Sequence, residues 1–237
     1  MSDSRIRYRF ELPDGSKTHI ELSFDPVSFR LRNPPPKEPP FWTELNFNQC
    51  ANCPLSLKEH THCPAALGLA PAIEALKGLV SFDGVKVTVL EGGRTIRVES
   101  TAQQALSSVM GLIMATSGCP WTDKLRPMAR FHLPFASEAE TLYRSVSMFL
   151  MARELDERAG RASRGIEALK QLYENLHVVN RDVSRRLGAA TRTDPARNAI
   201  ALLDSFTVLM PVAIEQMFEE ITPLFDAWNT DKSSDLT

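Results

Sequence analysis

The sequence lacks the short motifs that identify several large enzyme classes. It contains no Gly-x-Gly-x-x-Gly, no P-loop, no Gly-x-Ser-x-Gly and no His-Glu-x-x-His. Nucleotide binding, serine hydrolase chemistry and metalloprotease chemistry therefore have no support. No other catalytic motif is present, so the sequence gives no reason to predict an enzyme, and a non-enzymatic protein is the expectation.

The sequence also lacks a strong net charge, a long apolar run and an apolar leader. The formal net charge is −2, which argues against a protein-wide attraction to nucleic acid or to acidic membranes. The longest apolar run, residues 109–115, is shorter than the ~20 residues of a membrane-spanning helix and predicts a buried helix. Residues 1–5 lack the apolar segment of a signal peptide. We therefore expect a cytoplasmic protein without a membrane partner, whose cysteines are reduced.

Cysteine is scarce, yet three of the four cysteines lie in the short stretch 49–64. Two of them form a Cys-x2-Cys turn, the third follows it closely, and the fourth lies far downstream in a Ser-Gly-Cys-Pro sequence. Thiolates are soft ligands that suit zinc or an iron–sulfur cluster, and four of them complete a tetrahedral structural zinc site. The sequence therefore predicts a zinc site, with an iron–sulfur cluster as the alternative. The predicted ligands are Cys50, Cys53, Cys63 and Cys119.

Three other interpretations of the cysteines remain open. His60 or His62 could replace Cys119, because His60 completes a local set of four ligands with the first three cysteines. The pattern departs from common zinc ribbons, since a second Cys-x2-Cys is missing and Pro54 lacks an N–H that could bond to a thiolate. The cysteines could also be buried free thiols, or Cys50 and Cys53 could form a redox dithiol.

Two pairs of short segments have the pattern of β-hairpins. Residues 6–12 and 18–24 alternate in polarity around a Pro-Asp-Gly-Ser turn, and residues 85–89 and 95–98 flank a Glu-Gly-Gly-Arg turn. We expect the two hairpins to join in one antiparallel sheet. The proline-rich residues 25–44 between them predict a stiff connector.

The rest of the chain is predicted to be helical. Thr101 and Ser137 each stand three residues before a Gln or Glu, which is the capping box that begins a helix. Asp194 followed by Pro195 begins a further helix, which Pro211 should kink. The predicted helices cover residues 102–115, 138–158, 161–187 and 195–204 or longer.

These elements predict an α+β protein, with N-terminal antiparallel β-hairpins around a Cys-rich loop followed by a C-terminal α-helical region. We place the α+β region with the cysteine cluster at residues 1–135 and the helical region at residues 136–228. Residues 229–237 are polar and are predicted to form a disordered tail.

The helix predicted over residues 161–187 carries an apolar seam with alternating steps of three and four residues. An Asn inside such a seam can fix the register of a coiled coil. The seam therefore indicates either a coiled coil with a second copy of the chain or a helical hairpin within one chain. Its residues are Leu169, Tyr173, Leu176, Asn180, Val183 and Leu187.

Two basic groups of residues were considered as binding sites. Arginine is frequent between residues 153 and 192, but acidic neighbours interrupt it, so a solvated face of mixed charge is favoured over a nucleic-acid site. Arg126, Arg130 and His132 could hold an anion, although pairing of the arginines with acids such as Asp123 is the preferred interpretation.

Several segments together resemble a known family. They are Cys-x2-Cys-Pro-Leu at residues 50–55, His-x2-Cys-Pro at 60–64, Ser-Gly-Cys-Pro at 117–120 and Leu-Arg-Pro-Met-Ala-Arg-Phe-His-Leu-Pro at 125–134. The sequence is similar, over roughly residues 5–155, to a bacterial family of uncharacterised proteins, a domain of unknown function. The resemblance implies no activity.

The sequence thus favours a metal-stabilised, non-enzymatic regulatory or scaffold protein that forms a homo-oligomer through its C-terminal helices and acts on an unidentified protein partner. One alternative is a redox-active iron–sulfur or dithiol protein that uses the same cysteines. The second is a nucleic-acid binder with arginine-rich helices. Removal of the metal is expected to unfold the N-terminal half and to leave the C-terminal helices intact.

Overall fold

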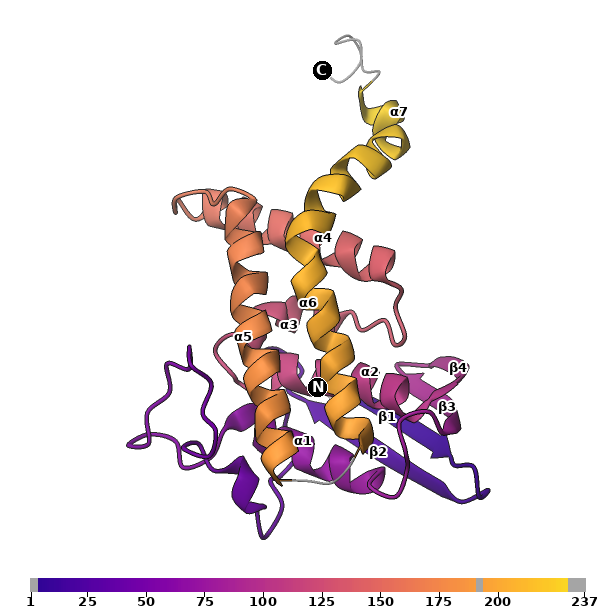
Figure 1. The fold of residues 1–237 in the computed structure, drawn as a ribbon. Coiled ribbons are helices and arrows are strands. Elements are labelled where there is room, and N and C mark those ends of the chain that lie inside the picture. The colour runs from indigo at the N-terminus through magenta and orange to yellow at the C-terminus, as the bar shows by residue number, and fades with distance from the viewer. Residues whose placement is uncertain (1–3, 191–193, 230–237) are drawn as a thin grey trace.

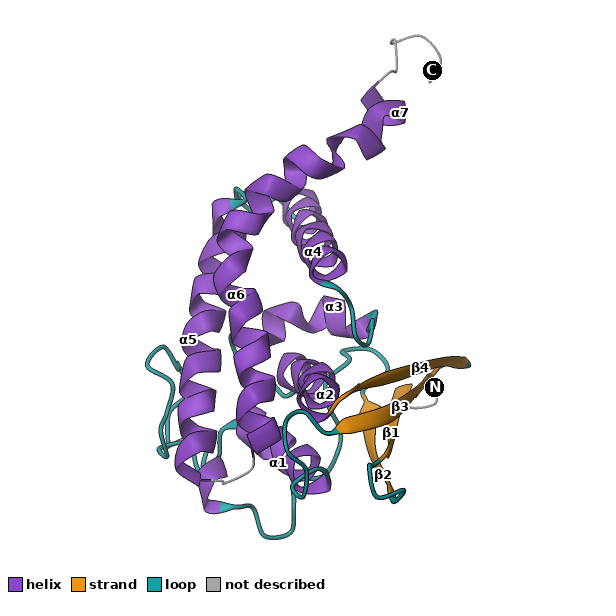
Figure 2. Ribbon diagram, turned by 45° about the vertical axis from the view of Figure 1, so that its right-hand side comes forward, coloured by secondary structure: helices purple, strands orange, loops and turns teal. Residues whose placement is uncertain are grey.

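The computed structural model describes residues 4–190 and 194–229, which form four strands and a larger set of helices (Figures 1 and 2). The strands are β1 Ser4–Glu11, β2 Lys17–Phe24, β3 Gly84–Glu91 and β4 Arg94–Thr101. The α-helices are α1 Pro64–Ala75, α2 Ala102–Thr116, α3 Arg126–Arg130, α4 Glu138–Arg158, α5 Glu167–Ala190, α6 Asp194–Ile221 and α7 Asp226–Asn229. Short 3₁₀ helices are η1 Phe41–Thr43, η2 Thr122–Leu125 and η3 Thr222–Phe225.

The strands form one antiparallel sheet in the order β2-β1-β3-β4. The two hairpins meet where β1 pairs with β3, and Tyr8 lies between Ile20 of β2 and Val89 of β3. Side chains alternate along the strands, so these three residues point to the same, buried face. The α+β class and the joining of the two hairpins are therefore confirmed.

Helix α2 lies between the sheet and the long helices α5 and α6 (Figure 2). The Thr101 hydroxyl accepts a hydrogen bond from the N–H of Gln104, and the predicted capping box is present. Residues 109–110 and 112–115 are buried, as the apolar run predicted. Because α2 is covered on both sides, it forms the centre of the protein's core.

Helices α5 and α6 pack side by side as an antiparallel pair, and α4 lies across their upper part (Figure 1). Helix α4 begins at the predicted capping box, in which Ser137 accepts from the N–H of Glu140. The prediction that α5 begins at residue 161 is wrong, because α4 ends at Arg158, Gly160 follows with φ 67°, and residues 159–166 connect the two helices. Helix α6 passes Pro211 without interruption, and its C-terminal part turns away from α5.

The apolar seam of α5 is buried within the chain itself. All six seam residues, Asn180 included, are at most 5% exposed. They face α6, α2 and the loop that carries the cysteines, so the seam packs in an intrachain helical hairpin. Self-association stays a prediction, and it would have to use other surfaces.

One hydrophobic core joins the two regions that the sequence suggested. Val183 and Leu187 of α5 and Ile200 of α6 belong to the same buried cluster as the sheet, α1 and α2. A second cluster joins α4, α5 and the middle of α6. The boundary at residue 135 therefore marks a change from mixed to helical structure across a shared core. The predicted tail, residues 229–237, lies outside the described residues except for Asn229 at the end of α7.

The helical stretch Asp194–Trp228 is long and apolar enough to cross a membrane, judged by length and composition alone. Core helices can pass the same test, and the first turns of α6 are buried in the core. Of the most apolar part of this stretch, however, 28% is buried inside the protein. The rest is exposed and includes Val208, Leu209 and Val212.

Candidate functional site

The first three cysteines lie in and around the loop that connects β2 to α1. The N–H of Cys53 donates to the carbonyl of Cys50 at 3.0 Å, which closes the Cys-x2-Cys turn. The N–H of Cys63 donates to the carbonyl of Thr43 at 2.8 Å, and the N–H of Leu45 donates to the carbonyl of Thr61. These bonds join the end of the loop to its middle, so Cys63 lies beside η1.

Cys63 is the N-cap residue of α1, and Pro64 occupies the first helical turn, where its missing N–H costs no hydrogen bond. The thiol makes no capping hydrogen bond, but the backbone N–H groups of Ala66 and Ala65 lie close enough to favour its charged form. Burial raises the pKa of the Cys63 thiol, while these two N–H groups and the charge of Arg186 oppose the rise. A thiolate at this position would therefore be stabilised by the helix N-terminus.

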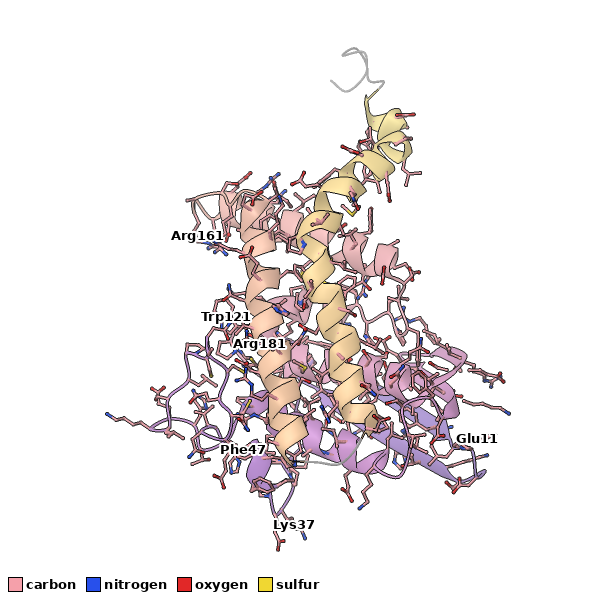
Figure 3. All side chains as sticks on the ribbon, in the orientation of Figure 1. Glu11, Lys37, Phe47, Trp121, Arg161 and Arg181 are labelled. Carbon is pink, nitrogen blue, oxygen red and sulfur yellow. The ribbon has the colours of Figure 1, made fainter. Side chains whose placement is uncertain are left out.

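Cys119 follows the end of α2. The chain turns there at Gly118, whose φ of 92° is accessible to glycine at little cost and whose tight turn the sequence predicted. Trp121 then donates its indole N–H to the carbonyl of Asn52 at 2.7 Å. This bond fixes the segment after Cys119 against the Cys-x2-Cys turn. Phe47, Trp121 and Arg181, labelled in Figure 3, come from three separate segments and gather beside α5.

The structure brings the four cysteines close enough to influence one another. Burial, with smaller contributions from the charges of Cys63, Cys119, Asp182 and Cys53, raises the pKa of the Cys50 thiol to about 12. The charge of Cys119 also raises the pKa of the Cys63 thiol. The loop before α1, the N-terminus of α1 and the segment after α2 thus bring the four thiols near enough for their charges to affect one another. Without a bound cation, Cys50 would be protonated at neutral pH.

A buried arginine of α5 lies next to this cluster. Arg186 is 1% exposed, and its guanidinium donates to the carbonyls of Trp42, Glu44 and Leu45 at 2.7, 2.6 and 3.2 Å. It makes no ion pair with a carboxylate of the described residues, and its buried Nε has no hydrogen-bond partner among them. The positive charge of Arg186 is therefore left without an anion unless a cysteine is a thiolate.

A buried aspartate one turn earlier on α5 contacts the Cys-x2-Cys turn. The Asp182 carboxylate accepts a hydrogen bond from the N–H of Ala51 at 2.8 Å and pairs with Arg181 and Arg185 on the outside of the helix. Burial raises the pKa of Asp182, but the bond from Ala51 and the two arginines outweigh it, so the pKa lies below its usual value. Asp182 is therefore a fixed negative charge that holds the turn.

The other residues predicted to line the site have partners elsewhere. His62 Nδ1 is hydrogen-bonded to the Thr43 hydroxyl at 2.8 Å, and Arg126 pairs with Asp123 at 2.9 Å. His132 is hydrogen-bonded to Tyr8 in the core. The preferred interpretation of Arg126 and His132 as satisfied residues is thus confirmed. Within residues 4–190 and 194–229, no group of three or more His, Cys, Asp or Glu side chains is arranged as a ligand set for a metal ion, so the metal stays a prediction.

Sequence reasoning missed the roles of Asp182 and Arg186. They stand four residues apart on one face of α5, a spacing that is readable in the sequence. Their partners, however, lie 131 to 144 residues away in the chain, in the loop around the cysteines. The available signal was a pair of charged residues beside the apolar seam, which suggests buried partners without identifying them.

Comparison with known families places the whole fold in one group. The family described as a domain of unknown function (DUF6901) matches residues 6–226. The chain belongs to this family. The predicted resemblance to a family of unknown function is thus confirmed, and the match extends beyond the predicted limit near residue 155 through the helical region. No curated protein and no solved structure matches the sequence.

Proposed function

We propose that the four cysteines bind one zinc ion, and that this DUF6901 protein is a metal-stabilised regulatory or scaffold protein. The observation that carries the proposal is the gathering of Cys50, Cys53, Cys63 and Cys119 next to the buried, unpaired charge of Arg186. Four thiolates on a divalent cation have a net charge of −2, which supplies the anion that Arg186 lacks. Four protein ligands also fill a tetrahedral site and leave no position for a substrate.

The protonation of Cys50 favours a metal over a redox dithiol. A reactive thiol has a pKa lowered towards neutrality by nearby positive charge, whereas the pKa of Cys50 is raised to about 12 by burial and by its neighbours. A metal ion displaces that proton because its charge dominates the local field. The same thiolates would suit an iron–sulfur cluster, and the colour of the protein distinguishes the two.

The arrangement of the arginines favours this proposal over nucleic-acid binding. Arg181 and Arg185 pair with Asp182, and Arg158 pairs with Glu154. Arg186 is buried and turned towards the cysteine loop. Such pairs reduce the free positive charge that phosphate contacts require, as the prediction of a mixed-charge face implied.

Self-association belongs to the same proposal, with a different surface from the predicted one. The seam of α5 is occupied inside the chain, while α4 and α6 expose large apolar side chains. We assign self-association to this surface, which we call the α4–α6 surface. Its residues are Tyr143, Leu150, Met151, Leu155, Val208, Leu209, Val212 and Phe218. Exposed apolar area of this kind is typical of contacts between chains.

The deciding experiment is metal analysis of protein purified without oxygen. We expect a colourless protein with one equivalent of zinc per chain, and titration of zinc into the metal-free protein should release protons, since Cys50 is protonated beforehand. Cys50→Ser should lose the zinc, and the matched control His60→Gln should keep it. A brown protein that contains iron and sulfide would show that the cysteines hold an iron–sulfur cluster instead of zinc. Four freely titratable thiols in metal-free protein would contradict both.

A further inference from the structure

A cavity of about 510 Å³ lies on the far side of α2 from the sheet's buried centre, among β4, α2, α3, α4, α5 and α6. Its volume falls in the range of about 300–1,000 Å³ that is usual for small-molecule sites. Most of its lining is aliphatic or aromatic, for example Leu112, Leu176 and Phe206. None of the four cysteines lines it, so the cavity is separate from the proposed metal centre.

The polar lining residue that most needs a partner is Asn180 of α5. Its side chain is 5% exposed and borders the cavity, and no hydrogen bond joins its amide to another described residue. The amide atoms are not fully enclosed by protein, so they are open to the cavity, where a bound molecule could pair with them. The amide both donates and accepts, so it matches a hydroxyl, amide or carbonyl group on a bound molecule.

A cation borders the same cavity on α4. Arg144 donates from one guanidinium nitrogen to the carbonyls of Met128 and Phe131, both at 2.7 Å. It makes no ion pair with a carboxylate in the part of the chain that the structure describes. The nearby Glu140 is instead held by Ser137. The remaining guanidinium N–H groups are therefore free to bind a carboxylate, whose geometry they match.

The other polar groups of the lining have partners or face solvent. The Thr207 hydroxyl donates to the carbonyl of Asp204, and the Thr122 hydroxyl donates to the carbonyl of Met114. His132 is hydrogen-bonded to Tyr8, and burial lowers its pKa to about 3, so it is neutral. Glu99, on β4, is exposed. Arg144 and Asn180, together with the half-buried Ser107 of α2, are thus the polar groups left for a ligand.

Arg144, on α4, and Asn180, on α5, both line the cavity, and Arg144 lies near the Tyr173 end of α5. Arg144 is adjacent in sequence to Ser145, whose hydroxyl bonds to that of Tyr173 at 2.7 Å. Tyr173, Leu176 and Asn180 line the cavity in succession along α5. The seven helical steps from Tyr173 to Asn180 span about 10 Å. An apolar wall therefore separates a cationic end from an amide end.

We propose that this cavity binds an apolar carboxylic acid with a hydrogen-bonding group at its opposite end. The carboxylate pairs with Arg144, the apolar body packs on Leu176 and Phe206, and the far group bonds to the Asn180 amide. Such a ligand satisfies both unpaired groups at once and displaces water from an apolar surface.

Three probes of equal chain length test the proposal by calorimetric titration of the full-length protein. They are octanol, octanoate, and hydroxyoctanoate with its hydroxyl on the last carbon. We expect binding to strengthen in that order, by about tenfold at each step, which is the worth of one hydrogen bond to a buried partner. Equal affinity of octanol and octanoate, or no binding of any probe, would overturn the proposal.

Two variants separate the two ends of the cavity. Arg144→Gln should weaken octanoate about tenfold and leave octanol unchanged, whereas Arg144→Lys should retain most of the preference for the acid. Asn180→Leu should reduce hydroxyoctanoate to the affinity of octanoate. Thr207→Val is the matched control, because it changes a lining residue whose hydroxyl is already hydrogen-bonded. It should leave the affinity for all three probes unchanged. If Asn180→Leu leaves all three affinities unchanged, the amide is not a ligand-binding group.

Discussion

The carboxylate of Asp182 accepts a hydrogen bond from the backbone N–H of Ala51 at 2.8 Å, between residues 131 positions apart in the chain. The contact joins the middle of α5 to the turn between Cys50 and Cys53. The Asp182 side chain is held in one position because it is buried and paired with Arg181 and Arg185. The cysteine turn is therefore supported by the helical region as well as by its own loop.

Replacing Asp182 should show how much of this support is charge and how much is the hydrogen bond. Asp182→Asn keeps an oxygen that can accept from Ala51, and we expect it to lower the free energy of unfolding by about 1 kcal/mol. Asp182→Ala leaves that N–H unbonded and should lower it by about 3 kcal/mol. Urea unfolding measures both values. Equal effects of the two variants would contradict a role for the hydrogen bond.

Stability should fall as the pH drops from 6.5 towards 3, because of His132. Burial, together with the charges of Arg144 and Arg94, lowers the pKa of His132 from 6.5 to about 3. The unfolded chain then binds a proton that the folded chain excludes, so the folded state loses about 1.4 kcal/mol for each pH unit within this window. Thermal unfolding across the window, compared with His132→Phe, measures the effect. The variant should show a smaller loss.

Gly118 should be intolerant of a side chain. Its φ is 92°, and a Cβ there would lie 3.2 Å from Arg30 Nη1. Gly118→Ala is expected to lower the free energy of unfolding by about 1–2 kcal/mol and to reduce zinc affinity, since Cys119 follows directly. Gly78→Ala is the control, because Gly78 has open space around it and no positive φ. Similar destabilisation by both substitutions would argue against a special role of the turn.

A charge on the α4–α6 surface should prevent self-association. Val212 is 64% exposed on α6, so Val212→Lys should leave the monomer folded and shift light scattering from an oligomer to a monomer. Val27 is 82% exposed in the loop after β2 and is not part of this surface, so Val27→Lys should leave the oligomer unchanged. A wild-type monomer at high protein concentration would contradict self-association altogether.

Features that depend on residues close together in the sequence could be predicted. The hairpins follow from alternation and turn residues, and the helices after Thr101 and Ser137 follow from capping boxes that the structure contains. The start of α5 was not predicted correctly: Arg161, Ala162 and Arg164 are good helix formers, but the segment also contains Ser163 and Gly165 and forms a connector after Gly160.

The candidate site was predictable in its cysteines and not in its surroundings. Soft ligands are recognisable by residue type, and the Gly118 turn suggested that Cys119 could join the others. The charges of Asp182 and Arg186 matter because of loops that lie far away in the sequence, and the pairing of α5 with α6 was one of two readings of the same seam. Tertiary contacts of this kind leave no local pattern to detect.

The central position of α2 has a consequence for synthesis of the chain on the ribosome. The sheet, α1 and the cysteine loop are complete before α6 is made, yet α2 remains uncovered on one side until Ala199 and Ile200 have emerged. During that interval the nascent protein presents a wide apolar surface. Chaperones that recognise such surfaces should therefore bind ribosome-bound chains that end between α3 and α6, and release them once α6 is complete.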